Sequence, residues 1–203
     1  LDGSEPTAAS PRYTGPVEIG KSARFRATAL REGGENASYS REFAFSKSTG
    51  RPAVLNTKPN DSYTFEGASL LVDGYHSRPV FTSGAWLGYL DEPLDVTIDM
   101  GGEQSYRSVE LETLAEKGDW IFPPSSVTVW VSDNGTDFTE VASVAVPEAK
   151  AGDADGIGRY RMQFPETSAR YLKVVAQNAA AIPAWHPGAG SKGFLFVDEV
   201  VVE

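Results

Sequence analysis

Apolar residues occupy alternate positions in several short stretches of this chain, and the pattern is clear in "VTVWVSDNGTDFTEV" (residues 127–141). Three valines there alternate with polar or aromatic residues, which is typical of a strand with one buried face. A second apolar run begins at Phe138, and between the two runs lies Asp133-Asn134-Gly135. Asn-Gly favours a tight turn because both residues tolerate positive φ. The stretch therefore predicts a β-hairpin.

The same stretch contains two other motifs. Its acidic residues have the spacing of a helix-loop-helix calcium loop, but the twelfth position counted from Asp133 is Val144 instead of a carboxylate. The flanking segments are also predicted to be strands. Asn134-Gly135-Thr136 is an acceptor for N-glycosylation only in a eukaryotic secretory pathway. We therefore interpret the stretch as a structural hairpin.

Similar runs recur at short intervals in residues 65–203, and no long amphipathic helix separates them. Several strands at regular spacing predict an all-β sandwich or jelly roll. The expected strands are "DVTIDM" (95–100), "SYRSVELETL" (105–114), "SVTVWVS" (126–132), "FTEVASVAV" (138–146), "GRYRMQF" (158–164), "ARYLKVVAQN" (169–178) and "FLFVDEVVV" (194–202).

The first part of the chain has a different pattern. Residues 1–46 are rich in turn formers and contain two expected strands, at 23–29 and 39–45, joined by the turn "REGGENAS" (31–38). So few strands hardly bury a core. We therefore expect the second half of a small β-sandwich whose first strands lie outside this chain. Residues 47–64 are polar and Pro-rich, and we expect a linker with some ordered contacts.

The composition narrows the possible functions. The 203 residues have a formal net charge of −10, and their basic residues are scattered. This argues against a nucleic-acid partner, which would need a basic patch. Cysteine is absent, which excludes disulfides, thiolate metal sites and a cysteine nucleophile. No apolar run approaches the roughly 20 residues of a membrane helix. The chain begins at Leu1 without a signal peptide, so we expect it to be part of a longer protein.

The second region resembles the discoidin-like, coagulation-factor type C family, whose sugar-binding members include the family 32 carbohydrate-binding modules. The matching pieces occur in the family's order and cover nearly all of the region. They are "LLVDG" (70–74), "VTIDMGG" (96–102), "VTVWVSDNGTDFTEV" (127–141), "ARYLKVVAQN" (169–178) and "FVDEVVV" (196–202). The resemblance implies a discoidin-like jelly-roll β-sandwich over residues 65–203.

The first region resembles the end of the small C-terminal β-sandwich of bacterial chitobiases and β-hexosaminidases. The matching pieces are "DGSEPTAASPRYTGPVEI" (2–19) and "ARFRATAL" (23–30). The two resemblances together imply the tail of a secreted family 20 glycoside hydrolase, a β-N-acetylhexosaminidase. The catalytic barrel of that family has no counterpart here. Asp198-Glu199 lies in an expected strand, where adjacent side chains point to opposite faces, so this pair cannot flank one glycosidic bond.

The resemblance also implies one structural calcium ion. Family members hold this ion with oxygen ligands, which suit a hard cation. The matching carboxylates here are Asp73 and Glu199, the carbonyls would come from Leu70 and Tyr75, and a hydroxyl from Ser77. The stretch after Asp73 departs from the family's usual spacing to the hydroxyl residue. In the alternative interpretation, Asp73 only caps a turn and Glu199 pairs with a nearby arginine.

Sugar recognition requires an aromatic face and convergent polar groups. In discoidin-like modules these lie in loops at one end of the sandwich. The candidates in turn-rich loops are Trp120, Trp185, His186, Tyr75, His76 and Arg78. The alternative interpretation is that these aromatics pack under the loops or dock onto a neighbouring domain.

We therefore expect a non-catalytic carbohydrate-binding module at the C-terminus of a secreted, bacterial β-hexosaminidase-like hydrolase. Its partners would be a glycan of the N-acetylhexosamine or galactose type and its own catalytic domain. An extracellular, cell-surface or periplasmic location follows from the resemblance. The alternative is a structural domain that docks on the catalytic domain and binds no sugar.

Overall fold

The computed structural model of the chain describes residues 4–31 and 36–203 and confirms the predicted all-β fold. Within these residues no helix is long and apolar enough to cross a membrane. The strands are β1 (Ala23–Ala29), β2 (Ala37–Phe43), β3 (Ala53–Leu55), β4 (Leu87–Tyr89), β5 (Leu94–Ala115), β6 (Ser126–Ser132), β7 (Thr139–Ala145), β8 (Gly156–Gln177) and β9 (Leu195–Val202). Short 3-10 turns connect them: η1 (Asp61–Tyr63), η2 (Gly67–Val72), η3 (Phe81–Ser83) and η4 (Lys117–Asp119).

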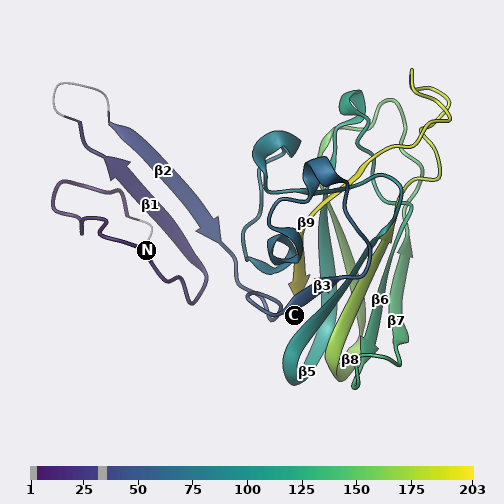
Figure 1. Cartoon of the computed structure of the whole chain (residues 1–203), viewed down its shortest axis with the longest axis horizontal. Coiled ribbons are helices and arrows are strands. Elements are labelled where there is room, and N and C mark those ends of the chain that lie inside the picture. Colours follow the sequence, from purple (N-terminus) through teal and green to yellow (C-terminus); the bar gives the residue numbers. More distant parts are fainter. Residues whose placement is uncertain (1–3, 32–35) are drawn as a thin grey trace.

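Two long strands, β5 and β8, build the sandwich because each takes part in both of its layers (Figure 1). In one layer the order is β4, β9, the second half of β5 and the first half of β8. In the other it is β3, the first half of β5, the second half of β8, β6 and β7. All these strand pairs are antiparallel. This architecture agrees with the predicted jelly roll.

The long strands differ from the sequence prediction in one respect. Residues 95–100 and 105–114 were expected as two strands, but both lie within the 22 residues of β5. The ladder between β5 and β8 has a register shift between Asp99 and Gln104, and Gly101 within it has φ +80°. Such an irregularity bends a strand without ending it. Strand β8 likewise joins the runs predicted separately at 158–164 and 169–178.

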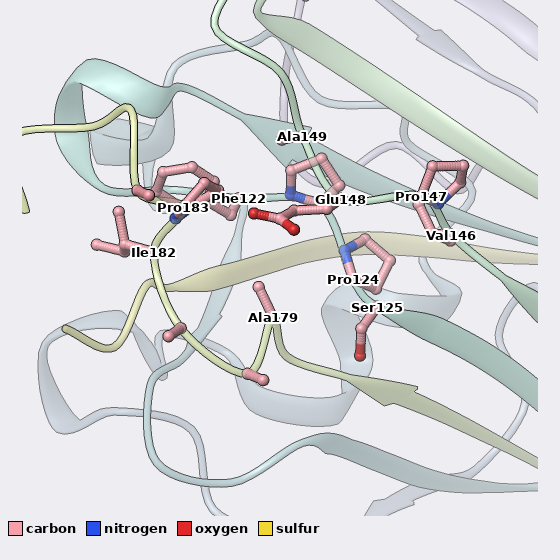
Figure 2. Close-up of a pocket in the computed structure, with 14 residues that line it drawn as sticks. Phe122, Pro124, Ser125, Val146, Pro147, Glu148, Ala149, Ala179, Ile182 and Pro183 are labelled. Atoms are coloured by element: carbon pink, nitrogen blue, oxygen red, sulfur yellow. The ribbon is translucent and has the colours of Figure 1, made fainter. Parts of the chain in front are cut away.

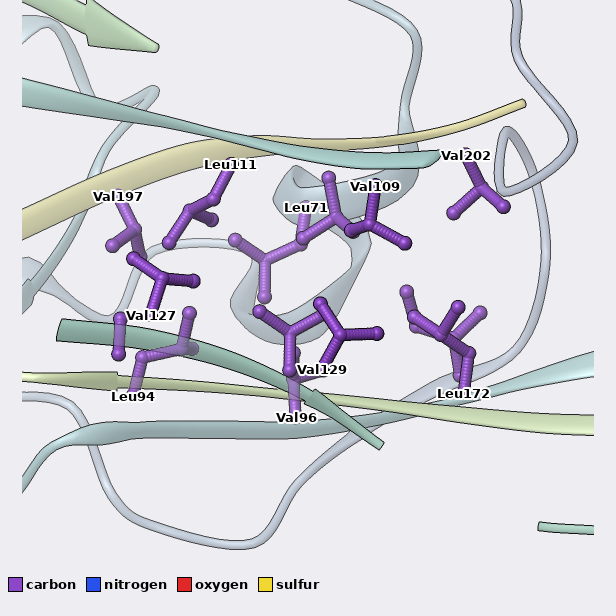
Figure 3. Close-up of a cluster of buried hydrophobic side chains, with 14 of the residues drawn as sticks. Leu71, Leu94, Val96, Val109, Leu111, Val127, Val129, Leu172, Val197 and Val202 are labelled. Carbon is purple, nitrogen blue, oxygen red and sulfur yellow. The ribbon is translucent and has the colours of Figure 1, made fainter. Parts of the chain in front are cut away.

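The hydrophobic core lies between the two layers (Figure 3). Alternate residues of β5, from Leu94 through Val96 to Ile98, are fully buried, as period-two patterning requires. Valines of β6 lie beside them in the same layer, valines of β9 face them from the other layer, and Leu71 of η2 fills the space between (Figure 3). Burial of a side chain of this size stabilises the fold by about 1.5–3 kcal/mol.

The hairpin predicted over residues 127–141 is confirmed by the antiparallel pairing of β6 with β7. Its connection spans residues 133–138, so it is longer than a two-residue turn. Asn134 organises it: its Oδ1 accepts from the N–H groups of Thr136 and Asp137, both at 2.9 Å, and its Nδ2 donates to Asp137 Oδ2 (2.7 Å). These bonds occupy the polar groups that a calcium loop would use.

The first region forms a separate two-stranded ribbon of β1 and β2 beside the sandwich (Figure 1). Most of the turn expected between these strands lies outside the described residues. The ribbon continues into the sandwich through contacts at the turn after η2, where the Ala44 N–H donates to Gly74 O (2.7 Å). Within the stretch expected as a linker, β3 pairs with β5, and Ser48 is buried.

A glycine in β4 provides a test of the packing. A Cβ atom on Gly88 would lie 2.9 Å from Phe196 Cζ and 2.9 Å from Tyr63 Cβ, whereas one on Gly102 would meet nothing within 4 Å. Gly88→Ala should therefore lower the free energy of unfolding by about 1–3 kcal/mol. Gly102→Ala, the matched control, should change it by less than about 1 kcal/mol. Chemical denaturation of both variants checks this, and equal stabilities would contradict the packing described here.

Candidate functional site

Three connections of the chain meet at the end of the sandwich opposite the C-terminus (Figure 1). The loop end, as we call it, consists of residues 116–125, 146–155 and 178–194. Backbone hydrogen bonds join its parts: the Ser125 N–H donates to Gln177 O (2.8 Å) and the Phe122 N–H to Phe194 O (2.9 Å). The connections meet because the bends in β5 and β8 return both ends of each strand to this end of the sandwich.

An aromatic cluster lies in the loop end and consists of Trp120, Phe122, Trp185 and His186. Phe122 and His186 are buried, whereas Trp120 and Trp185 are 41% and 40% exposed. The centroid of the His186 ring lies 6.0 Å from that of Trp120 and 5.6 Å from that of Trp185, both nearly perpendicular to it. The structure thus brings together three of the predicted sugar-binding residues and presents two indoles to solvent.

The surrounding backbone fixes both indoles. Trp120 follows η4 in the left-handed conformation (φ +64°). Its ring packs on Gly188, where a Cβ atom would lie only 2.8 Å from the indole Cζ2. The Trp185 Nε1–H donates to Ala149 O (3.0 Å). Side chains held in this way lose little rotamer freedom when a ligand packs on them.

His186 is the buried member of the cluster that lies against both indoles, and its ring is held by two hydrogen bonds. Its Nε2 lies 3.0 Å from Lys117 O, and its Nδ1 lies 3.1 Å from the Gly188 N. Because a carbonyl can only accept and an N–H can only donate, the imidazole is the neutral tautomer with its proton on Nε2. Both ring nitrogens are therefore already bonded, and the role open to His186 is to orient Trp120 and Trp185.

A groove of about 400 Å³ lies beside the cluster. Phe122, Pro124, Pro147 and Ile182 give it largely apolar walls, and Glu148 extends its carboxylate between them (Figure 2). Of the described residues that line the groove, Glu148 is the one with a charge. The indole of Trp185 adjoins the groove, because it donates a hydrogen bond to Ala149, which lines it.

A second polar site lies where β9 meets the turn after η2. A bulge places two residues of β9, Asp198 and Glu199, opposite the single residue Glu112 of β5. The Ser77 N–H donates to Asp198 Oδ2 (2.7 Å), and the Gly74 N–H lies 3.3 Å from each Glu199 oxygen. The prediction that the two carboxylates point away from each other is therefore wrong, because the bulge breaks the alternation and both reach the same turn.

These carboxylates are 1% and 0% exposed, so neither can reach a glycosidic bond in solution. Burial, and then the charges of Glu112 and Asp73, raises the pKa of Asp198 to about 8. Burial, and then the charges of Asp73 and Asp198, raises the pKa of Glu199 to about 9. Burial also raises the pKa of Asp73. Like charges crowded in this way would be stabilised by a cation.

Glu112 extends this site and was not predicted from the sequence. It is 1% exposed, and its Oε2 accepts from Arg159 Nε (2.9 Å) and lies 2.9 Å from His76 Nδ1. The hydrogen bond to Glu112 is the largest of the effects that raise the pKa of His76. The only signal in the sequence is a charged residue in a strand of mostly buried positions, which does not identify its partners.

The predicted metal ligands cluster around the turn after η2. The carboxylate of Asp73 accepts from the Tyr75 N–H (2.7 Å), so it caps its own turn, and Ser77 Oγ donates to a backbone carbonyl. Leu70 is buried in η2. Within residues 4–31 and 36–203, no three His, Asp or Glu side chains are arranged to hold a metal ion. A metal ion here would depend on backbone carbonyls as well as on Asp73 and Glu199.

The remaining sugar-binding candidates are Tyr75, His76 and Arg78, and their contacts are with residues outside the aromatic cluster. The guanidinium carbon of Arg41, from β2, lies 3.5 Å from the centroid of the Tyr75 ring, and His76 is bonded to Glu112. Arg78 is exposed. In the described part of the chain, no hydrogen bond, ion pair or ring contact joins these three residues to the loop end. Tyr75 thus lies at the junction between the ribbon and the sandwich.

Comparisons with known proteins agree with this architecture. Residues 56–192 match the family profile described as the F5/8 type C domain, and residues 1–41 match that of the chitobiase/beta-hexosaminidase C-terminal domain. Curated proteins gave no match to this chain.

Two solved structures share the fold. Chitosan-binding module 1 of a chitosanase/glucanase from Paenibacillus sp. IK-5 is 18% identical with a TM-score of 0.50, and the alignment covers 78% of this chain and 98% of that module. Module 2 of the same enzyme, in complex with chitotriose, is 17% identical with a TM-score of 0.50, over 77% of this chain and 98% of the module. At these identities the likeness concerns the fold alone.

The contact between Gly188 and Trp120 gives a test of the cluster. Gly188→Ala should push the indole outward, because the added methyl group would lie within 3.0 Å of two of its carbon atoms. The half-exposed ring can move, so we expect a loss of stability below about 1 kcal/mol. Tryptophan emission should shift to longer wavelength and acrylamide quenching should increase. Gly152→Ala, which meets nothing within 4 Å, is the control. Identical spectra for wild type and Gly188→Ala would contradict the described packing of the Trp120 ring on Gly188.

Proposed function

This chain belongs to the F5/8 type C domain family, and we propose on that premise that it is a non-catalytic carbohydrate-binding module whose site is the loop end. The observation that supports this most strongly is the pair Trp120 and Trp185, each about two-fifths exposed, of which Trp185 is hydrogen-bonded to Ala149 in the wall of the groove. Large aromatic faces left in water at a loop end suit the C–H face of a sugar ring. The apolar groove extends this surface beyond one ring.

Such a module acts by binding a glycan and does not catalyse a reaction. With two aromatic faces and few polar groups, we expect a dissociation constant of roughly 0.1–1 mM, near −4 to −5.5 kcal/mol. Weak binding of this kind is useful when the module is linked to a second functional domain, because it raises the effective concentration of that domain on the glycan.

The match of residues 1–41 to the chitobiase/beta-hexosaminidase C-terminal domain supports a finer proposal about the parent protein. We propose that the parent is a secreted, bacterial β-hexosaminidase-like hydrolase that works outside the cell or in the periplasm. The glycan would then be of the N-acetylhexosamine or galactose type, and the catalytic domain of the same chain would be a further partner.

We also propose one structural calcium ion at the turn after η2. The carboxylates of Asp73 and Glu199 and the carbonyls of Leu70 and Tyr75 would supply its oxygen ligands, which suit a hard cation. The buried negative charges around Glu199 support this, because a divalent cation would stabilise their ionised forms. The ion would tie β9 to this turn and so support the ribbon junction, without a direct part in sugar binding.

A docking function remains the second candidate. It is favoured by the packing of the Trp120 ring on Gly188 and by the hydrogen bond already made by the Trp185 indole. In that case the two indoles would contact the catalytic domain of the full-length chain instead of a glycan.

Sugar titration distinguishes the two candidates. Galactose, N-acetylgalactosamine, N-acetylglucosamine and chitin oligosaccharides should be titrated while tryptophan fluorescence is recorded. We expect a saturable change with at least one of them, weakened about fivefold or more in Trp185→Ala and in Trp120→Ala. Trp130→Phe, altered on a strand of the sandwich, is the control and should bind normally. A lack of response to every sugar at tens of millimolar would favour docking.

Calcium binding has its own test. Calcium at about 100 times its dissociation constant should stabilise the protein by about 2.7 kcal/mol, which corresponds to a rise in Tm of roughly 5–10 °C for a domain of this size. Glu199→Gln should abolish the rise, whereas Glu140→Gln, on the exposed face of β7, should retain it. If neither calcium nor a chelator changes the Tm of the wild-type protein, the proposed ion is wrong.

A further inference from the structure

The groove contains a feature that carbohydrate binding in general does not explain, namely one carboxylate among apolar walls. We propose that the loop end selects glycans that carry a protonated amine, such as glucosamine oligosaccharides, and that Glu148 is the residue that recognises the amine. This inference rests on the proposed carbohydrate-binding function and names the class of sugar.

The position of Glu148 is the first argument. Its carboxylate projects into the groove toward Phe122 and Pro183 (Figure 2). The residue is exposed, and no other described residue forms a hydrogen bond or ion pair with it. A cation bound between the carboxylate and the apolar walls would displace water from both, and the two charges would then attract each other in a medium less polar than bulk water. The carboxylate of Glu148 is therefore available to bind a positively charged group of a ligand in the groove.

The link between Glu148 and the aromatic cluster is the second argument. Ala149, the next residue in the chain, accepts the hydrogen bond from the Trp185 indole (3.0 Å). This bond fixes the segment that carries the carboxylate relative to the exposed ring. A sugar stacked on Trp185 would thus present its substituents toward the groove. An ammonium group would form a hydrogen bond with Glu148 in which both partners are charged, whereas in the bond from an acetamido or hydroxyl group only the carboxylate would be charged.

The charge around the groove is the third argument. The three segments of the loop end carry five carboxylates against three lysines. Lys117 is already paired with Asp155, and Lys192 with Asp91, which lies outside the loop end. The remaining lysine, Lys150, lies two residues from Glu148 and is exposed. The segments therefore have a negative excess that favours cationic ligands over neutral ones and disfavours uronic acids.

The test compares trisaccharides that differ in the substituent at C2, which carries a charge in only one of them. Glucosamine trimers, N-acetylglucosamine trimers and cellotriose are titrated by calorimetry at one ionic strength, at a pH at which the glucosamine amine is protonated. We expect the glucosamine trimer to bind about three- to tenfold more tightly than the other two. Glu148→Gln should remove this preference while the neutral trimers bind as before. Glu140→Gln, which makes the same charge change on β7, is the matched control and should keep the preference. Lys150→Gln should leave it intact or increase it.

Each other outcome has a definite meaning. Equal affinity for charged and neutral trimers, or a preference that survives in Glu148→Gln, would overturn the inference and leave the proposed sugar site standing. Trilysine that binds as tightly as the glucosamine trimer, with the same dependence on Glu148, would overturn it as well, because the groove would then be a general anionic patch. If no trimer binds and Trp185→Ala changes nothing, the proposed function itself fails, and with it the inference.

Discussion

The pairing of β5 with β8 is the constraint on which the rest of the structure depends. Each strand runs through both layers of the sandwich, and the ladder between them continues from Leu94 and Ala176 to Ala115 and Gly156 with only two irregularities. The bend that allows this returns both ends of each strand to one end of the molecule. The loop end exists for this reason, and its aromatic residues are brought together although they are far apart in the sequence.

A second irregularity, the bulge in β9, gives the structure its other polar site. By placing Asp198 and Glu199 opposite Glu112, it buries three carboxylates near the turn after η2. Burial of ionised carboxylates is unfavourable, and the structure partly offsets this cost with the backbone N–H that donates to Asp198 and with Arg159 beside Glu112. The same turn contacts the β1–β2 ribbon, so the state of this site and the attachment of the ribbon depend on common residues.

The sequence could predict the parts of the structure that depend on local patterns. Period-two alternation located the strands, and Asn134-Gly135 located a hairpin. It could not predict the continuity of β5 and β8, because glycines such as Gly101 look like a turn until the partner strand is known. It also could not predict the burial of Glu112 or the exposure of Glu148, since both depend on contacts between distant segments. Trp120, Trp185 and His186 were predicted as candidates, but the buried, bonded state of His186 required the structure.

The central claim is that the loop end contacts a glycan, and the four tryptophans allow it to be tested by NMR. Trp120 and Trp185 lie in the loop end, Trp86 is fully buried in a second cluster with Leu114 and Phe196, and Trp130 lies on β6. The indole N–H resonances of all four would be followed during titration with chitin and glucosamine oligosaccharides. We expect saturable shifts for Trp120 and Trp185 and none for Trp86 and Trp130. Shifts confined to Trp130, or no shift in any indole, would contradict the account.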